Sequence, residues 1–358
     1  MPCRRGFDSF LGLTQSHITY VSHVNSGYPD LMECSDSVEE GLQFKTLGEL
    51  GGLYSMDICE ERAKQIIENH DDEDKPLFLY LAVQAPHSPF YAPLRYMDSE
   101  CTGERCVMQG MVRAIEALME GVINKMKSKG MWDDTIMIWH SDNGAPESDF
   151  CSNYPLRGYK YYLWEGGVRN PAFIYSPNKD LMPNRGKSNN LIHVSDWFDT
   201  IIGMSGGWDN WEAAGKIKPN DLDSIDQSRH LLHGEDGLRT NIMLHIDPIK
   251  HIAAYIKEDY KLLIGDQSYS GTCDSNLVYN ISIESLDMSN ILLYNIVQDP
   301  SETTDLWEDG QHDDVGVEMI DDLLVYMSHQ KKMLCLLDVD SEAFPSSDVP
   351  WFLPWMVK

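Results

Sequence analysis

The sequence has 358 residues, of which 42% are hydrophobic and 24% charged, a balance that is typical of globular proteins and argues against global disorder. Its formal net charge of −29 disfavours nucleic acid as a partner, because a phosphate backbone binds basic surfaces. The longest apolar stretches are strand-sized, so no membrane span is expected, and no apolar segment typical of a signal peptide follows the first residues.

The N-terminal part combines an irregular segment with regular elements. Residues 1–55 are rich in Gly, Ser and Tyr without a clear period, and we expect loops packed on a core. Apolar residues recur at roughly helical spacing over 56–70 and over about 104–129, which predicts two helices, the second one stopped by Gly130. Between them, the apolar run 77–83 predicts a strand.

A second apolar strand is expected over 135–140, so the element order is helix, strand, helix, strand. Neither this strand nor 77–83 alternates apolar with polar residues, as expected when helices cover both faces of a parallel sheet. The pattern therefore predicts an α/β layered domain. Another strand is expected over 168–177, and a short helix over 195–207 with Ser195 as its N-cap.

The C-terminal third has a different pattern. Residues 208–238 contain few apolar side chains and predict a surface crossing between domains. Short apolar runs then predict strands, including a hairpin that turns at Glu258, and a last helix is expected over about 315–334. We therefore expect an α/β domain over 1–235 and a small α+β domain over 236–358, in which the helix packs on an antiparallel sheet.

The cysteines and one asparagine bear on the compartment. Eight cysteines are scattered without a C-x-x-C pair, so they give no zinc or redox-motif signal and are compatible with disulfides or inert thiols. Their spacing does not fix which of them pair. The triplet that starts at Asn280 permits N-glycosylation, although such triplets are common by chance.

Polar residues follow the two predicted strands of the α/β domain. His87 lies in the loop after the first strand, and Asp142 and Asn143 follow the second, just after His140. Ligands of open α/β sheets bind outside the carboxyl ends of the strands. Carboxylate and amide oxygens are hard donors that suit Ca²⁺ or Mg²⁺, and Gly144 would let the chain kink so that both side chains face one ion. On its own, Asp-Asn-Gly also fits a simple turn, and His140 fits a strand-end histidine with a hydrogen-bonded partner.

A basic segment comes next. Residues 153–171 carry Arg157, Lys160 and Arg169 together with a glycine pair. A cation held by acidic ligands with a lysine nearby can bind an anionic tetrahedral group and stabilise the charge that develops on it. The segment therefore favours a site over a turn, and Arg157 and Trp164 are expected to support the lysine's loop by stacking.

Three motifs carry a resemblance to a known family. They are HSDNGAP, PLRGYKYYLWEGGVRNPAFIYSP and HVSDWFDTI, and the RGxKxxxWEGGxR pattern in the second is highly specific. The sequence resembles the sulfatase family, especially its arylsulfatase B-like branch, and RRGFDSFLG, PLFLYLAVQAPHSPFYAP and PWFLPWM extend the similarity over the whole chain. The resemblance implies an alkaline-phosphatase-like α/β sandwich with a central, mostly parallel sheet. It also implies a lysosomal or secreted hydrolase of sulfate esters, whose substrate is a sulfated small molecule or glycan.

The resemblance further implies roles for single residues. Asp142 and Asn143 match two Ca²⁺ ligands of the family, and Lys160 matches the lysine that binds a sulfate oxygen. His87 matches the histidine that contacts the sulfate and helps to protonate the leaving oxygen, which agrees with the usual role of histidine as a proton donor near neutral pH. Glu165 is expected to be an outer partner of the site.

The sequence departs from the family pattern at the motif that supplies the catalytic nucleophile. Sulfatases attack sulfur with a formylglycine made from a Cys or Ser in a C-x-P-S-R-type motif, and none of the eight cysteines lies in such a motif. Two consecutive Asp ligands and a Lys-His motif are also missing, so we expect an N-terminally incomplete chain with no nucleophile and no turnover as written. Two alternatives stay open: a non-catalytic paralogue that binds sulfated glycans, and a related phosphoesterase.

Overall fold

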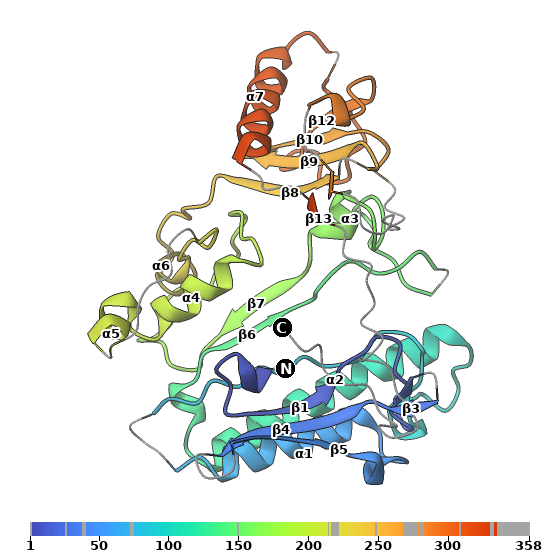
Figure 1. The fold of residues 1–358 in the computed structure, drawn as a ribbon, viewed down its shortest axis with the longest axis vertical. Helices are drawn as coiled ribbons and strands as arrows, with labels where there is room; N and C mark the ends of the chain where they lie inside the picture. The colour runs from blue at the N-terminus through green and yellow to red at the C-terminus, as the bar shows by residue number, and fades with distance from the viewer. Residues whose placement is uncertain are drawn as a thin grey trace. The chain divides into compact units, whose positions relative to one another are not determined.

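The computed structural model describes residues 2–25, 27–37, 41–71, 75–148, 150–213, 215, 222–247, 249–267, 278–279, 283–307, 309–329 and 333–334. These residues form two compact units, one within residues 1–133 and one within 134–337. Figure 1 colours the chain by residue number, from blue at the N-terminus to red at the C-terminus. The second unit extends across residue 235, and the domain boundary expected there stays a prediction. The glycosylation triplet at Asn280 and the closing PWFLPWM motif lie outside the described residues.

A three-stranded antiparallel sheet opens the first unit. Its order is β1 (Ser9–Leu13), β4 (Leu31–Ser37), β5 (Gly41–Thr46), with the short pair β2 (Val24–Asn25) and β3 (Tyr28–Pro29) between β1 and β4 in the chain. A disulfide joins Cys3, in the 3₁₀ turn η1 (Pro2–Arg4), to Cys34 of β4. The prediction of loops over 1–55 is therefore wrong. These strands are held by backbone pairing and a cross-link, neither of which leaves a periodic side-chain pattern.

Two long helices form the core of the first unit. Helix α1 (Ser55–Glu68) and helix α2 (Glu104–Ser128) confirm the two predicted helices. Ala63 and Ile67 of α1 belong to one buried cluster with Met111 and Leu118 of α2, because apolar residues three or four apart share one helix face. Short 3₁₀ turns lie at η2 (Gly48–Leu50), η3 (Leu94–Tyr96) and η4 (Trp132–Asp134).

The apolar run 77–83 forms no strand in the described chain, so that prediction is wrong. Leu77, Leu79 and Val83 pack against the core of the first unit, whereas Phe78 is 56% exposed. Three residues of the run are thus partly buried while Phe78 and Leu81 are exposed, so the run is not covered on both faces as its continuous apolar composition suggested. A strand also needs a neighbour to accept its backbone hydrogen bonds, which composition does not supply.

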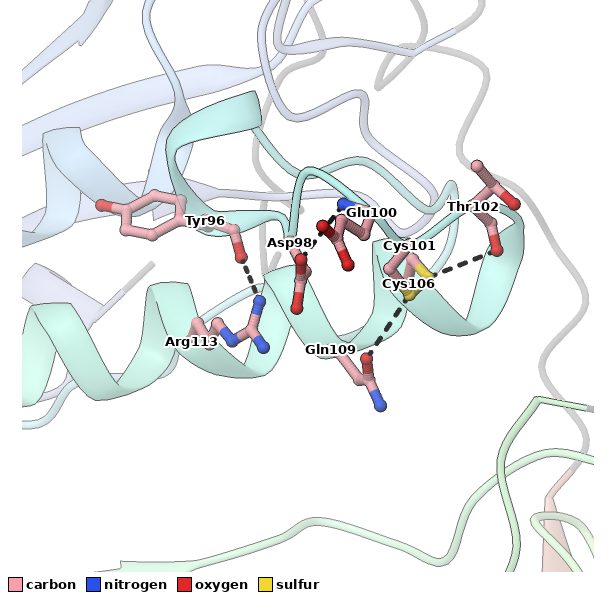
Figure 2. The surroundings of a disulfide bond; sticks show 8 residues. All are labelled: Tyr96, Asp98, Glu100, Cys101, Thr102, Cys106, Gln109 and Arg113. Carbon is pink, nitrogen blue, oxygen red and sulfur yellow. Dashed lines mark hydrogen bonds between the residues drawn. A yellow bond between two sulfur atoms is a disulfide. The ribbon is translucent and has the colours of Figure 1, made fainter.

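A second disulfide lies at the start of α2. It joins Cys101 to Cys106, and Figure 2 shows it beside Thr102 and Gln109. In the same view, Arg113 of α2 donates a hydrogen bond to the carbonyl oxygen of Tyr96, over 3.2 Å. These contacts tie the loop before α2 to the helix surface.

The second unit begins with an antiparallel pair, β6 (Met137–His140) and β7 (Ala172–Tyr175), in which His140 lies opposite Ala172. All strand pairs within the described ranges are antiparallel, so the parallel sheet that was expected is not among them. The reason lies in the run 77–83, which was to be the parallel neighbour of β6 and forms no strand.

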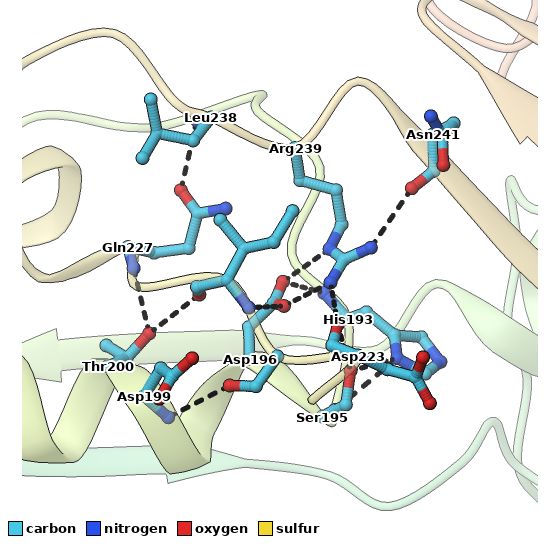
Figure 3. A network of polar contacts seen from close by, with 12 residues as sticks. His193, Ser195, Asp196, Asp199, Thr200, Asp223, Gln227, Leu238, Arg239 and Asn241 are labelled. Atoms are coloured by element: carbon cyan, nitrogen blue, oxygen red, sulfur yellow. Dashed lines mark hydrogen bonds and ion pairs between the residues drawn. The ribbon is translucent and has the colours of Figure 1, made fainter. Parts of the chain in front are cut away.

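A buried carboxylate joins the helices of the second unit to the strand that follows them. These helices are α4 (Asp196–Met204), α5 (Gly207–Ala213) and α6 (Ser228–His233). Asp196 accepts hydrogen bonds from Arg239 and from the backbone N–H groups of His193 and Ile225, as Figure 3 shows for the labelled residues. Ser195 precedes α4 but makes no side-chain capping bond, so its expected capping role is wrong, since Asp196 binds the backbone instead.

A four-stranded antiparallel sheet follows. Its order is β12 (Ile291–Asn295), β10 (Tyr260–Ile264), β9 (Ile252–Lys257), β8 (Asn241–Asp247). The hairpin between β9 and β10 is confirmed, and helix α7 (Asp313–His329) packs Met319 and Leu323 on this sheet, as predicted. The remaining elements are η5 (Ile283–Ser285) and the pair β11 (Val278–Tyr279) with β13 (Met333–Leu334). No helix among the described residues has the length and apolar character that crossing a membrane requires.

Candidate functional site

The loop after β6 carries the two predicted metal ligands. The backbone N–H of Asn143 donates to Oδ1 of Asp142 over 2.8 Å, and the Asn143 side-chain amide donates to the carbonyl oxygen of Gly144 over 2.9 Å. The Asn170 amide donates to the Asp142 carbonyl oxygen over 3.0 Å, which holds the loop beside the start of β7. Asp142 is exposed and Asn143 half-buried, so both side chains lie within reach of a ligand.

Gly144 brings this loop against the glycine pair of the basic segment. Its N–H donates to the carbonyl oxygen of Gly167 over 3.0 Å. A Cβ atom at position 144 would lie 1.8 Å from the carbonyl oxygen of Gly166, which no side chain tolerates. The small residue after Asp-Asn is therefore required by a close approach of two backbones, and not only by a turn.

Lys160 is joined to the same loop through its backbone. Its N–H donates to the carbonyl oxygen of Ala145 over 2.9 Å. Asn153 closes the assembly: its Oδ1 accepts from the Ala145 N–H over 2.8 Å, and its amide group donates to the carbonyl oxygens of Ala145 and Gly158. Lys160 and the Asp142–Asn143 loop are thus parts of one hydrogen-bonded assembly.

The Lys160 side chain is half-buried beside an aromatic ring. Its Nζ lies 5.3 Å from the centre of the Tyr161 ring, a cation–π distance. Tyr161 has φ of +79°, in the left-handed region. The expected stacking in this segment is confirmed, because the Arg157 guanidinium lies 3.7 Å from the centre of the Trp164 ring.

A buried charge cluster supports helix α3 (Glu165–Val168), which follows the Lys160 loop. Lys261 of β10 is fully buried, and its Nζ lies 3.0 Å from Glu165 Oε1 and 2.9 Å from Glu302 Oε1. Glu302 Oε2 accepts from the Glu165 backbone N–H over 2.7 Å. Burial raises the pKa of Glu302, and the nearby Lys261 opposes this effect only in part. The contacts of Glu165 therefore extend to the C-terminal sheet, and its expected role as an outer partner of the site stays a prediction.

The oxygen donors suit a hard cation in type. Asp142 offers a carboxylate and Asn143 an amide oxygen, and the buried Oδ1 of Asn170 has no hydrogen-bond partner although its amide nitrogen contacts the same loop. Among the described residues, no cluster of three or more His, Cys, Asp or Glu side chains has the arrangement of a metal site. Because Ca²⁺ takes six to eight oxygens, these residues would form one side of a site.

His87 belongs to the first unit. Its Nδ1 donates to the carbonyl oxygen of Ser88 over 2.7 Å, since a carbonyl can only accept. Tyr20 donates to the carbonyl oxygen of His87 over 2.8 Å, and the His17 ring meets the His87 ring edge-on at 5.2 Å between centroids. Nδ1 of His87 is therefore engaged by a backbone carbonyl oxygen.

His140 has the structural role that was expected for it. Its Nδ1 lies 3.1 Å from the carbonyl oxygen of Ser141, and its ring stacks on Trp197 with 5.8 Å between centroids. The sequence did not single out Asn153, Lys261, Glu302 or His17. The residue types of Asn153 and His17 carry no motif, and the contacts of Lys261 and Glu302 with Glu165 span 96 and 137 residues.

The fold and the site define a mixed α/β protein in which a lysine and hard oxygen donors share one assembly at a strand end. The chain belongs to the sulfatase family, because the family model described as Sulfatase matches residues 1–207. The expected family is thereby confirmed.

Known relatives agree with this assignment. Arylsulfatase J of Mus musculus is 32% identical over 337 residues, which are 86% of this chain and 54% of the relative. N-acetylgalactosamine-6-sulfatase of Mus musculus is 24% identical over 243 residues, 65% of this chain and 44% of the relative. The crystal structure of the PsFucS1 sulfatase from Pseudoalteromonas sp. has a TM-score of 0.64 at 20% identity, covers 93% of this chain and 69% of that one, and shows a shared sulfatase fold. The chain spans about half the length of the curated relatives it matches.

Proposed function

We propose that this chain carries the substrate-binding part of a sulfuric ester hydrolase of the arylsulfatase B-like branch, which acts on sulfate esters of glycan sugars. The single observation that carries the proposal is the shared assembly of Lys160 with the Asp142–Asn143 loop. The arylsulfatase J match supports the branch, because it extends over more of the chain than the match to the N-acetylgalactosamine sulfatase. The latter relative's name supports a sugar sulfate as the substrate.

Each residue has a distinct task in this proposal. The Lys160 ammonium binds a sulfate oxygen and offsets its negative charge. His87 donates a proton to the leaving oxygen, which is a poor leaving group until it is protonated. Asp142 and Asn143 would contribute two ligands to Ca²⁺, which polarises the sulfate when it is bound. A central, mostly parallel sheet of the alkaline-phosphatase-like fold belongs to the same proposal.

The proposed chemistry of this chain does not include a nucleophilic attack on sulfur. No cysteine of the chain lies in the formylglycine motif, so none of the cysteines fits that group and no covalent step is derived. We therefore propose that the chain binds sulfate esters and does not turn them over above background. The binding-only paralogue is the second candidate, and a phosphoesterase is the third and weakest, because the Lys160 segment is sulfatase-like.

The compartment is proposed to be lysosomal or extracellular. Two disulfides in the first unit support an oxidising environment, and glycosylation at Asn280 belongs to the same proposal. Sulfated small molecules or glycans are the proposed partners, and nucleic acid is not, given the net charge of −29.

The proposal is tested by binding and turnover together. Methyl sulfate should bind the chain in an NMR titration, and Lys160→Ala should abolish that binding, because the ammonium that neutralises the anion is gone. Lys187→Ala, an exposed lysine of the same unit, is the matched control and should bind as the wild type does. Hydrolysis of an aryl sulfate by the chain alone would contradict the proposal that it binds sulfate esters without turnover. The contradiction would be strongest if Asp142→Ala or Lys160→Ala abolished that hydrolysis.

The two leading candidates are separated by a chimaera. If a segment of arylsulfatase J that carries the formylglycine motif is joined before this chain, turnover is expected from a sulfatase and not from a binding-only paralogue. If the chimaera folds, and its motif cysteine is converted to formylglycine, but it still shows no turnover, the result would favour the binding-only paralogue.

A further inference from the structure

We infer that Tyr161 is a sugar-binding residue, whose ring stacks on the pyranose that carries the sulfate group bound by Lys160. The inference rests on the proposed function, because it takes Lys160 as the residue that binds sulfate. It goes further by naming the side chain that would distinguish a sulfated sugar from any other sulfate ester.

The backbone of Tyr161 is held in an unfavourable conformation. Its φ of +79° lies in the left-handed region, which is energetically unfavourable for a residue with a Cβ atom. The chain is fixed on both sides of it, since Lys160 N–H donates to the Ala145 carbonyl oxygen over 2.9 Å and Tyr162 N–H donates to the Tyr159 carbonyl oxygen over 3.0 Å. Backbone strain that neighbours hold in this way concentrates at binding sites.

Folding of the loop does not account for this strain. The Tyr161 side chain remains 60% exposed, so most of its apolar surface stays in water and contributes little to stability. Glycine would adopt the same φ without strain. A tyrosine that is both strained and exposed is therefore better explained by what its ring contacts in a complex.

The ring and the adjacent ammonium match a sulfated sugar at two points. Lys160 Nζ lies 5.3 Å from the centre of the Tyr161 ring, so an anion bound by the ammonium lies close to the aromatic surface. The face of an aromatic ring is electron-rich and attracts the C–H bonds of a pyranose, which carry partial positive charge. Methyl sulfate has the sulfate group but no pyranose ring, so it would contact the Lys160 ammonium and would not stack on Tyr161.

The experiment is a pair of saturation-transfer NMR titrations, one with N-acetylgalactosamine 6-sulfate and one with methyl sulfate. Tyr161→Gly should bind the sugar sulfate roughly three- to tenfold more weakly, the range expected for loss of one aromatic contact, and should bind methyl sulfate unchanged. Its melting temperature should be equal to or above that of the wild type, because the strain is relieved. Tyr161→Phe keeps the ring and should keep the affinity for the sugar.

Tyr154→Ala is the matched control. It removes another tyrosine ring of the same segment, which is 89% exposed, and it should leave both affinities as in the wild type. Unchanged sugar affinity in Tyr161→Gly, an equal loss in Tyr154→Ala, or a lower melting temperature in Tyr161→Gly would overturn the inference and leave the proposed function standing. A wild-type chain that binds neither ligand would overturn the proposed function, and the inference with it.

Discussion

At position 144 the absence of a side chain sets the geometry of the candidate site. The atom that a Cβ would meet, 1.8 Å away, is a backbone carbonyl oxygen and cannot rotate aside. Gly144→Ala should therefore lower the free energy of unfolding by about 1–3 kcal/mol, as overpacking does. Because the Lys160 backbone is bonded to the next residue, Ala145, methyl sulfate binding should weaken as well. Urea denaturation and an NMR titration check the two effects.

Gly186→Ala serves as the control for this change. The nearest heavy atom to a Cβ at position 186 is Asn184 Oδ1 at 3.7 Å, an ordinary contact. This variant should stay within about 0.5 kcal/mol of the wild type. Equal stability of Gly144→Ala and Gly186→Ala would show that the two backbones can separate without cost.

Strand β10 supports the Lys160 loop through one side chain. Lys261→Met would leave Glu302 buried without its cation and Glu165 with only Arg169, whose Nη1 lies 3.4 Å from Glu165 Oε2. This change should lower the free energy of unfolding by about 3–5 kcal/mol. Replacing both glutamates by glutamine in the same chain should recover part of the loss, since no buried charge then remains unpaired. Chemical denaturation of the single and triple variants measures this.

The neighbouring strand β9 offers a matched control in Lys257. Its ion pairs with Glu318 and Asp322, at 2.6 and 2.7 Å, join side chains that are partly exposed to water. Lys257→Met should therefore cost no more than about 1 kcal/mol. A loss as large as that of Lys261→Met would mean that burial is not what makes the Lys261 cluster important.

Elements with their own periodicity were predictable from sequence, and elements defined by distant partners were not. The heptad-like spacing of α2 and the turn of the β9–β10 hairpin are local signals, and both predictions are confirmed. The run 77–83 has the composition of a strand but pairs with no strand among the residues that the structure describes, and composition alone does not show whether a neighbouring strand exists. The sheet of β1, β4 and β5 was missed for the opposite reason, since its short strands are held by pairing and by a cross-link.

The same distinction applies to the site. Asp142, Asn143 and Lys160 were found because their residue types follow a strand and match a motif, whereas their roles stay predictions. Asn153 and Lys261 were not found, because their importance comes from which backbone or carboxylate they meet in the folded chain. His87 was placed in the site by resemblance, and its proton-donor role awaits measurement.

The whole molecule should lose stability in mildly acidic solution. Burial lowers the pKa of His23, His193 and His245, and neighbouring carboxylates oppose this for the last two only in part. In the unfolded chain, histidines have their ordinary pKa of about 6.5. As the pH falls below that value, the unfolded chain therefore takes up more protons on these residues than the folded chain does. The stability contributed by these neutral histidines is full above pH 6.5 and is lost as the pH falls through it.

Urea unfolding at pH 7.5 and 5.5 measures this loss. His23→Gln and His245→Gln should each show a smaller difference between the two pH values than the wild type. His233→Gln, at an exposed histidine, is the control and should keep the wild-type difference. Identical pH dependence in all variants would assign the effect to other groups.

The cluster of Lys261, Glu165 and Glu302 limits how this chain can be recombined with its relatives. A crossover at residue 235, the boundary that sequence alone suggested, would take the glutamate at 165 from one parent and the other two positions from the second parent. Wherever the parents differ at these positions, the hybrid would bury a charge without its counterpart. The three positions should therefore come from the same parent in any functional hybrid. In recombination, the C-terminal sheet and the loop of Lys160 should then be exchanged together.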